Sequence, residues 1–274
     1  MTVCIAPLLS PAAVGRFHRE GYLLYQQPVL SSDKFTRLQT TFDGLLRRWQ
    51  ADPRAPSPEH MDVPHFLHPE LFEWLLDDAV LDLVEPLLGP NIALFSSHFI
   101  CKPAQCGKRV PWHEDSWYWR GRLDPMEVVT VWLALDPSTP ENGCMRVIPG
   151  SQKRGSQSTY ESVAGPAVFD SEMKRETLAL DQAVNCVLQP NECSLHAAGL
   201  AHGSEANRSG LRRCGYTMRY VSTRTRLNVD AGPDDGFRLY LARGRDHAGN
   251  NYGDPTRPNA TWIAAHPDRF PAGH

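Results

Sequence analysis

The chain has 274 residues and a net charge of −3; hydrophobic residues make up 41% of it and charged residues 22%. This length suits one large domain as well as two small ones, and the composition excludes an intrinsically disordered chain. The slightly acidic balance argues against a nucleic-acid-binding protein, because such proteins usually carry a basic surface.

Residues 1–90 are predicted to form a mainly helical support. Ser10 is a candidate N-cap with Pro11 at the first helical position, and Gly21 ends this helix before the short strand YLLYQQPVL. Residues 31–50 carry apolar side chains at helical spacing and predict a second helix. Residues 68–89 predict two further short helices, closed by Gly89.

Residues 91–245 are predicted to form a β-barrel core. Turn residues separate the short apolar runs IALFSSHFICK, VVTVWLAL, CMRVIPG, NCVLQ, ECSLHAA, CGYTMRYVS and FRLYLARG. Many short strands of this kind are typical of a barrel or sandwich. Within this region, Glu141-Asn142-Gly143 predicts a hairpin.

Two segments lack periodicity. Residues 150–178 are polar and small, which predicts a long loop of the kind that often covers an active site. Residues 246–274 are rich in Gly, Pro and Asn, which predicts a C-terminal surface tail. We therefore expect residues 1–274 to form a single domain with a helical support, a barrel core and a tail.

Cysteine usage and targeting signals suggest a compartment. Seven cysteines occur, an odd number, and none forms a Cys-x-x-Cys pair, so neither a disulfide framework nor a zinc ribbon is expected. The first residues lack the basic and apolar parts of a signal peptide, and no apolar run reaches ~18 residues. We expect a cytoplasmic protein without a membrane partner.

The stretch PWHEDSWYW places His113 and Asp115 two residues apart. In an extended segment their side chains face the same way, and such an N,O pair suits Fe(II), Mn(II) or Zn(II). A third ligand is then needed, and His202 is the best candidate because it follows a strand-like run and precedes a Gly-Ser turn. Two histidines and one carboxylate leave about three metal positions open, as in non-haem Fe(II) oxygenases.

An oxo acid bound at those open positions needs a cation for its far carboxylate. Arginine suits this task because its planar fork binds a carboxylate bidentately. Arg213 lies 213 − 202 = 11 residues after His202, at the start of the next strand-like run. Its neighbour Arg212 is the main rival, and alternation along a strand puts the two arginines on opposite faces.

The segments WHED, ENGCMRVIPGS and HGSEANRSGLRR together resemble the phytanoyl-CoA dioxygenase family of Fe(II)/2-oxoglutarate-dependent oxygenases. The resemblance runs from about residue 14 to 245. It implies a double-stranded β-helix, a jelly-roll barrel of the cupin type, with flanking helices. It also implies Fe(II), 2-oxoglutarate and O2 as cofactor and co-substrates, and oxidation of a small organic molecule with release of succinate and CO2.

The family's site residues map onto this chain position by position. His113, Asp115 and His202 match the iron ligands, and Arg213 matches the arginine that anchors 2-oxoglutarate. The flanking positions of the co-substrate site match Ser204, Trp132 and His98, and Trp119 matches an aromatic residue that lines the substrate pocket in some members.

The aromatic residues after Asp115 are candidates for the substrate site. If the strand continues, Trp117 and Trp119 share the face of Asp115, while Tyr118 points away. Packing in the core is the rival interpretation for each of them. His98 is equally compatible with a co-substrate contact and with packing. His196 is predicted to be a buried, hydrogen-bonded histidine, and Asn207 to cap the turn after His202.

Two departures from the family pattern bear on the interpretation. Gln152 stands where the family often has histidine in PGSH, which leaves the role of this position open. Asp115 is present, whereas the halogenating branch of the family replaces this aspartate by a small residue, so we expect an oxygenase and not a halogenase.

Three alternatives remain open from sequence. The same iron chemistry can end in hydroxylation, desaturation, epimerisation or ring closure. A metal-binding barrel without oxygenase activity is a second alternative, although it has no need of a carboxylate clamp such as Arg213. The third is an enzyme for CoA thioesters, which would want a basic groove near the barrel mouth. The sequence settles neither the substrate nor the oligomeric state.

Overall fold

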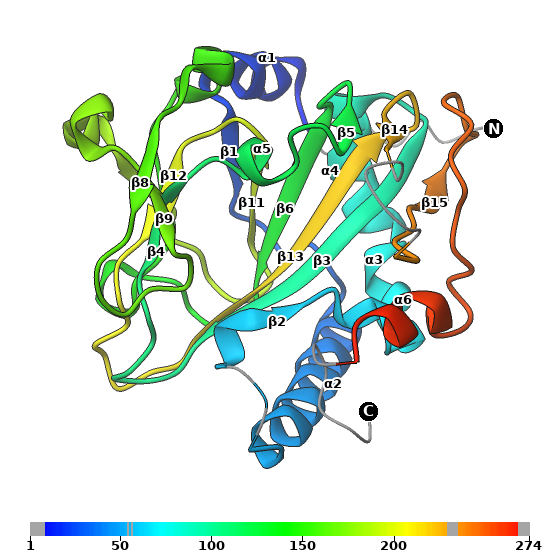
Figure 1. The fold of residues 1–274 in the computed structure, drawn as a ribbon, viewed down its shortest axis with the longest axis horizontal. Helices are drawn as coiled ribbons and strands as arrows, with labels where there is room; N and C mark the ends of the chain where they lie inside the picture. Colours follow the sequence, from blue (N-terminus) through cyan, green and yellow to red (C-terminus); the bar gives the residue numbers. More distant parts are fainter. Residues whose placement is uncertain (1–8, 54, 56, 229–234, 268–274) are drawn as a thin grey trace.

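The computed structural model describes residues 9–53, 55, 57–228 and 235–267. Strands dominate, and helices pack against them (Figure 1). The α-helices are α1 (Pro11–Glu20), α2 (Ser32–Ala51), α3 (Phe72–Leu75), α4 (Asp78–Leu88), α5 (Asp115–Tyr118) and α6 (Ala260–Ala265). The strands are β1 (Tyr22–Tyr25), β2 (Met61–Asp62), β3 (Ile92–Lys102), β4 (Val110–His113), β5 (Leu123–Asp124), β6 (Val128–Ala134), β7 (Arg146–Val147), β8 (Tyr160–Ser162), β9 (Ser171–Met173), β10 (Val184–Asn185), β11 (Cys193–Ala197), β12 (His202–Ser204), β13 (Arg213–Ser222), β14 (Arg226–Leu227) and β15 (Tyr240–Arg243).

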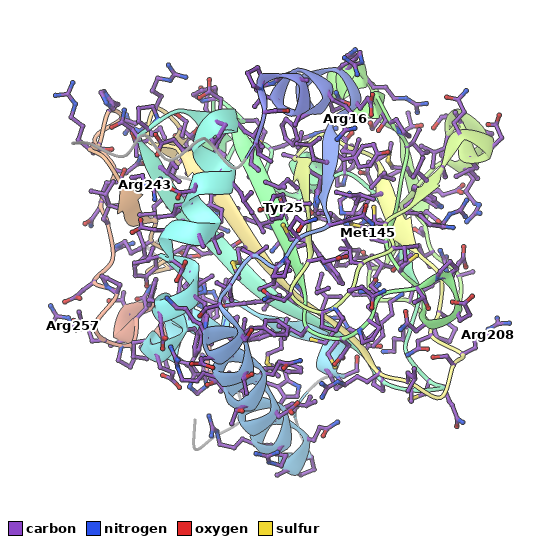
Figure 2. All side chains as sticks on the ribbon, turned by 180° about the vertical axis from the view of Figure 1, so that it is seen from behind. Arg16, Tyr25, Met145, Arg208, Arg243 and Arg257 are labelled. Carbon is purple, nitrogen blue, oxygen red and sulfur yellow. The ribbon has the colours of Figure 1, made fainter. Side chains whose placement is uncertain are left out.

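Two antiparallel sheets make up the barrel. The larger sheet has the order β1-β11-β6-β13-β3-β15, with β2 also paired to β3. The smaller sheet has the order β10-β7-β12-β4 and lies to the left of the long strands in Figure 1. Figure 2, seen from behind, shows α2 and α4 in front of those strands, so the helices cover the opposite face of the larger sheet. Arginines such as Arg208 and Arg257 project outward around the periphery (Figure 2).

The helices predicted within the described part of residues 9–90 are present, whereas β1 and β2 from the same range join the larger sheet. The Ser10 hydroxyl accepts a hydrogen bond from the Ala13 amide at 3.2 Å and caps α1. Gly21 ends the helix with a φ of 82°, a left-handed conformation that glycine adopts at little cost. In α2 the predicted apolar face is buried, and Phe42 packs on Phe99 of β3 with ring centroids 4.8 Å apart. Burying a side chain of this size contributes roughly 1.5–3 kcal/mol.

The hairpin predicted at Glu141-Asn142-Gly143 was wrong. Strands β6 and β7 flank this segment but belong to different sheets and do not pair with each other. Asn142 caps a short 3-10 turn, since its side chain accepts from the Thr139 amide and donates to the Pro137 carbonyl. Gly143 follows with a φ of 76°. The turn chemistry thus makes a corner between the two sheets.

Residues 150–178 are more ordered than predicted. They contain the 3-10 segment Ser151–Gln157 and the hairpin of β8 and β9. The predicted C-terminal tail, residues 246–274, contains the short helix α6, whose Trp262 is 2% exposed and packs edge-on against Phe66. Trp262 thus anchors this C-terminal segment, although its other residues are typical of a loop. Residues 268–274 lie outside the described part of the chain. No helix among the described residues is both long and apolar enough to cross a membrane.

Candidate metal centre and adjoining cavities

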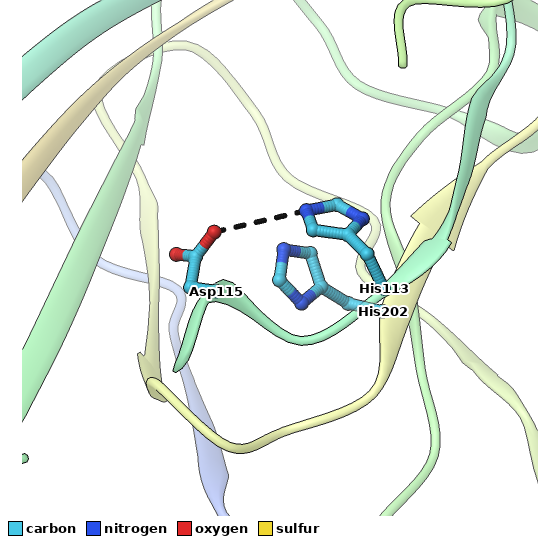
Figure 3. Close-up of side chains that lie close together, drawn as sticks. All are labelled: His113, Asp115 and His202. Atoms are coloured by element: carbon cyan, nitrogen blue, oxygen red, sulfur yellow. Dashed lines mark ion pairs between the residues drawn. The ribbon is translucent and has the colours of Figure 1, made fainter. Parts of the chain in front are cut away.

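The smaller sheet brings His113, Asp115 and His202 together (Figure 3). His113 ends β4, His202 begins β12, and the two are direct cross-strand partners. One ligand atom from each of the three residues lies within 4.8 Å of the others, and all three are buried. The expectation that the chain stays extended to Asp115 was wrong, because α5 begins at that residue. The Ser116 amide donates to the Ala198 carbonyl and turns the chain out of the strand.

Both imidazoles are oriented by backbone carbonyls. The Nδ1 atom of His113 donates to the Pro111 carbonyl at 2.8 Å, and that of His202 donates to the Leu200 carbonyl at 2.9 Å. Each Nε2 atom therefore keeps its lone pair, and that of His113 lies 3.7 Å from Asp115 Oδ1 (Figure 3). Burial lowers the pKa of His202 well below its ordinary value, so the ring is neutral at pH 7. This set of two imidazole nitrogens and one carboxylate oxygen, with both rings oriented by backbone carbonyls, fits a divalent metal such as Fe(II).

Three residues surround the second carboxylate oxygen of Asp115, Oδ2. Arg219 Nε and Thr130 Oγ1 each lie 3.5 Å from Asp115 Oδ2, and His196 Nε2 lies at 4.0 Å. These three residues form one row across β13, β6 and β11. Burial opposes ionisation of Asp115, but Arg219 and His113 outweigh it and hold the pKa of this carboxyl well below its usual range. The carboxylate is thus charged and can offer Oδ1 to a metal.

His196 was predicted to be a buried, hydrogen-bonded histidine. It is buried, but its Nδ1 atom has no hydrogen-bond partner among the described residues, and burial lowers its pKa to about 4. Its neighbours are Asp115 and the ring of His202, whose centroid lies 4.8 Å away. His196 lies beside Asp115 because it pairs with Thr130 across strands β11 and β6, and this pairing could not be predicted from the sequence.

A narrow inner cavity runs from the trio to Arg213. Arg213 is 2% exposed, and its Nε and Nη2 atoms donate to the Gly143 carbonyl at 3.1 and 2.6 Å. Burial lowers the pKa of Arg213 to about 10, so it remains charged at pH 7. Arg212 points the other way and pairs with Asp136 and Asp43, each at 2.8 Å. The predicted alternation is therefore confirmed.

The other residues predicted to flank a co-substrate line the same cavity, namely His98, Trp132 and Ser204. The Trp132 ring lies 5.1 Å from the Arg213 guanidinium. It fits there because Gly215 of β13 has no side chain, and an added Cβ would come within 2.0 Å of the ring. Met145, labelled in Figure 2, contributes to the apolar wall.

Lys102, which was not predicted from sequence, contacts Ser204 and pairs across strands with Arg213, two residues that line the inner cavity. It is fully buried, is the cross-strand partner of Arg213, and donates to Ser204 Oγ at 2.7 Å and to the Glu205 carbonyl. Burial, together with the charge of Arg213, lowers the pKa of this amine to about 6. The signal was present in the sequence: His98, Ile100 and Lys102 alternate along one face of β3.

A wide outer cavity of about 650 Å³ opens on the far side of Asp115. Trp119, Tyr118 and Phe169 line it. Trp117 does not: its ring stacks on Tyr160 of the β8–β9 hairpin, with centroids 3.9 Å apart. The strand alternation that paired Trp117 with Trp119 fails because these residues lie in and after α5, where a helical turn replaces the strand.

The β8–β9 segment reaches the centre itself. The ring of Phe169 lies 4.9 Å from the ring of His113, and Phe169 lines both cavities. His98 also lines both cavities; its Nε2 atom donates to the Glu59 carbonyl at 2.8 Å, and its Nδ1 atom lies 3.7 Å from Asp62. Asn207 caps the loop after β12 as predicted, since its Oδ1 atom accepts from the Ser209 amide at 3.0 Å.

Comparison with known proteins agrees with this geometry. A model of the family described as phytanoyl-CoA dioxygenase (PhyH) matches residues 17–215. Ectoine dioxygenase from Sphingopyxis alaskensis is 24% identical over 260 residues, which cover 86% of this chain and 83% of that protein.

Solved structures show the same fold. The ectoine dioxygenase of S. alaskensis with 2-oxoglutarate and 5-hydroxyectoine matches with a TM-score of 0.66 at 22% identity, covering 93% of this chain and 91% of that one. A non-heme α-ketoglutarate-dependent carbocyclase from nogalamycin biosynthesis matches with a TM-score of 0.67 at 20% identity, covering 90% of this chain and 95% of that one. The barrel is the double-stranded β-helix of these oxygenases, and with the family match over most of its length the chain belongs to the phytanoyl-CoA dioxygenase family of iron- and 2-oxoglutarate-dependent oxygenases.

Proposed function

We propose that this chain oxidises a C–H bond of a small organic molecule, by hydroxylation, while 2-oxoglutarate is converted to succinate and CO2. The observation that carries the proposal is the position of the buried trio between two cavities. The narrow cavity ends at Arg213, and the wide cavity opens beyond Asp115. A co-substrate and a substrate can thus approach one centre from different sides.

Each residue has a definite task in this proposal. His113, Asp115 and His202 bind Fe(II), which when present supplies the redox chemistry with dioxygen. Arg213 binds the far carboxylate of 2-oxoglutarate, and Ser204, held by Lys102, lies beside it. Trp132 and His98 flank the co-substrate and exclude water from it. Trp119 lines the cavity that receives the substrate.

Ligand deletion tests the proposal. Replacing His113 or His202 with Ala should weaken Fe(II) binding by more than the roughly 10- to 100-fold that loss of an outer-shell partner costs. The metal site is at the barrel mouth, so the fold should survive, as checked by circular dichroism. Fe(II) binding is measured by anaerobic titration, and the charge-transfer absorption with 2-oxoglutarate reports the assembled site.

The control is His18→Ala, because His18 is exposed on α1. It should leave both signals unchanged. Undiminished Fe(II) binding in the His113 and His202 variants would refute the assignment. Screening compounds by their shift of the charge-transfer absorption, followed by product analysis, then separates hydroxylation from ring closure, epimerisation and desaturation.

A further inference from the structure

Strand β13 presents a second arginine on the face that carries Arg213. Alternation along the strand puts Arg213, Gly215, Thr217 and Arg219 on one side, and Arg213, Thr217 and Arg219 all line the inner cavity. At about 3.3 Å per residue, Arg219 lies roughly 20 Å along the strand from Arg213. Arg219 alone of these residues also lines the wide outer cavity. One strand face thus carries a cation at each end of the site.

The guanidinium of Arg219 is largely uncommitted. Arg219 is 9% exposed. Among the described residues, it donates a hydrogen bond through its Nε atom alone, to Asp115 Oδ2 at 3.5 Å. The guanidinium carbon of Arg219 lies 5.4 Å from the centroid of the Trp119 ring. An arginine side chain has five N–H donors in a rigid fork. The two Nη groups, four of those donors, have no hydrogen-bond partner in the described part of the chain and are free to bind a ligand in the outer cavity that Arg219 lines.

The other arginine that lines the outer cavity, Arg122, already has a carboxylate partner, since it lies 3.6 Å from Asp235. Arg219, in contrast, shares its carboxylate partner, Asp115, with the metal trio. With a divalent ion bound by Asp115, that carboxylate no longer balances Arg219 alone. The positive charge of Arg219 at the floor of the outer cavity is then not fully balanced, and an anion can bind there.

Aromatic rings form part of the wall of this cavity, and polar residues such as His60, Asp62 and Asp235 line the rest. Phe95 packs edge-on against Trp119 at 5.1 Å and lies 5.5 Å from Phe237, and Trp262 of α6 adds to the aromatic part. Apolar and aromatic surfaces with a few polar groups among them, here including Arg219, are typical of a site for a small molecule. The volume of about 650 Å³ exceeds what a single amino acid requires.

We propose that the substrate is a carboxylate-bearing molecule with a flat apolar body, and that Arg219 binds its carboxylate in the outer cavity. This inference rests on the proposed function, because it takes the outer cavity as the substrate site. The planar fork of Arg219 offers a carboxylate two parallel hydrogen bonds. The apolar body then lies between the aromatic rings, with a C–H bond held near the trio.

Two probes of equal shape and different charge test the proposal. Binding of 2-naphthoate and of the neutral 2-naphthamide is measured by calorimetry, on the full chain with Fe(II) and saturating 2-oxoglutarate under argon. We expect naphthoate to bind about 10- to 100-fold more tightly, as a charged hydrogen-bond pair requires. Arg219→Gln should abolish this preference and leave naphthamide binding nearly unchanged. Equal binding of the two probes to the unmodified chain would overturn the proposal.

Control variants distinguish a direct contact with Arg219 from a general effect of charge and from binding elsewhere. Arg224→Gln removes an exposed positive charge beyond the end of β13 and should keep the preference. Arg213→Gln should also keep it when the probe is titrated without 2-oxoglutarate, which shows that naphthoate does not bind at the co-substrate position. If Arg219→Gln instead weakens Fe(II) binding and lowers both probe affinities alike, Arg219 only positions Asp115 and the proposal fails. Absence of Fe(II) and 2-oxoglutarate binding in the unmodified chain would refute the proposed function instead.

Discussion

At the scale of single residues, two adjacent arginines show how alternation along a strand gives equal side chains different surroundings. Arg213 faces the inner cavity and is held by the Gly143 carbonyl, whereas Arg212 lies outside and pairs with Asp136 and Asp43. Both side chains carry the same charge. Only their faces differ, and under the proposed function the face decides which of them can bind 2-oxoglutarate.

Replacing Arg213 with Lys keeps the charge but removes the planar fork. We expect the Kd for 2-oxoglutarate to rise by about 10- to 100-fold, equivalent to ~1.5–3 kcal/mol, while Fe(II) binding stays unchanged. The measurement is an anaerobic titration of the Fe(II)-loaded protein. Arg212→Lys is the matched control and should leave the Kd as it is. A larger effect in Arg212→Lys would reverse the assignment of the two faces.

Trp119→Ala should weaken substrate binding by roughly two- to tenfold, the worth of one aromatic contact. It should also raise the ratio of succinate to oxidised product, because a loosely held substrate lets 2-oxoglutarate decay unproductively. Both products are quantified together, with a substrate found by the charge-transfer screen. Trp117→Ala should leave that ratio nearly unchanged, since its ring stacks on Tyr160 outside the cavity. Tight coupling in Trp119→Ala would show that its ring serves packing alone.

At the scale of elements, the corner at Asn142-Gly143 links the fold to the site. Gly143 has a φ of 76°, and a Cβ at this position would lie 2.4 Å from the Glu205 carbonyl oxygen. Its own carbonyl accepts both hydrogen bonds of Arg213. The corner between the two sheets therefore also sets the direction of the arginine.

Gly143→Ala should lower the free energy of unfolding by more than ~2 kcal/mol, because a left-handed alanine costs roughly 1–2 kcal/mol before any clash. Affinity for 2-oxoglutarate should fall as well. Gly165→Ala is the control, since Gly165 has a φ of 86° but an added Cβ there would have no atom within 4 Å. Gly165→Ala should lower the free energy of unfolding only by the cost of the left-handed backbone conformation, and it should leave 2-oxoglutarate binding unchanged. Denaturant unfolding and calorimetry measure the two quantities, and equal losses in both variants would contradict the argument.

The elements also show what sequence could reveal. Strand β3 forms over the predicted run Ile92–Lys102, because an eleven-residue stretch rich in apolar residues between turns has few alternatives. The Arg213 register and the buried face of α2 followed from simple periodicities. The hairpin at Asn142-Gly143 failed because local turn chemistry does not say which sheet the next strand joins. Trp117 was misplaced because one helical turn after Asp115 breaks the alternation, and Trp262 was missed because only tertiary packing marks its segment.

At the scale of the whole molecule, burial keeps several histidines neutral. Burial lowers the pKa of His65 to about 3 and of His196 to about 4, and it also lowers those of His98 and His202. In the unfolded chain each ring has an ordinary pKa near 6.5. Below that pH the unfolded chain therefore binds more protons than the folded one, and the metal-free protein loses stability as pH falls.

For His65 alone the loss between pH 8 and pH 5 amounts to about 2 kcal/mol. His65→Leu should lower stability at pH 8, because the 2.7 Å hydrogen bond to Ser97 is lost. It should also flatten the pH dependence by that same amount. Urea unfolding of the metal-free protein at several pH values measures this, with exposed His18→Ala as the control. An unchanged slope in His65→Leu would mean that His65 is protonated in the folded state.

The pairing of β1 with β11 has a consequence for the order of assembly. Tyr22 pairs with His196, which is 196 − 22 = 174 residues further along the chain. During synthesis on the ribosome, β1 emerges early and must wait for its partner strand, and long-range pairing of this kind slows folding. Until then β1 is an exposed apolar edge to which chaperones or other nascent chains can bind. The larger sheet is completed only after its later strands, β11, β13 and β15, have been made.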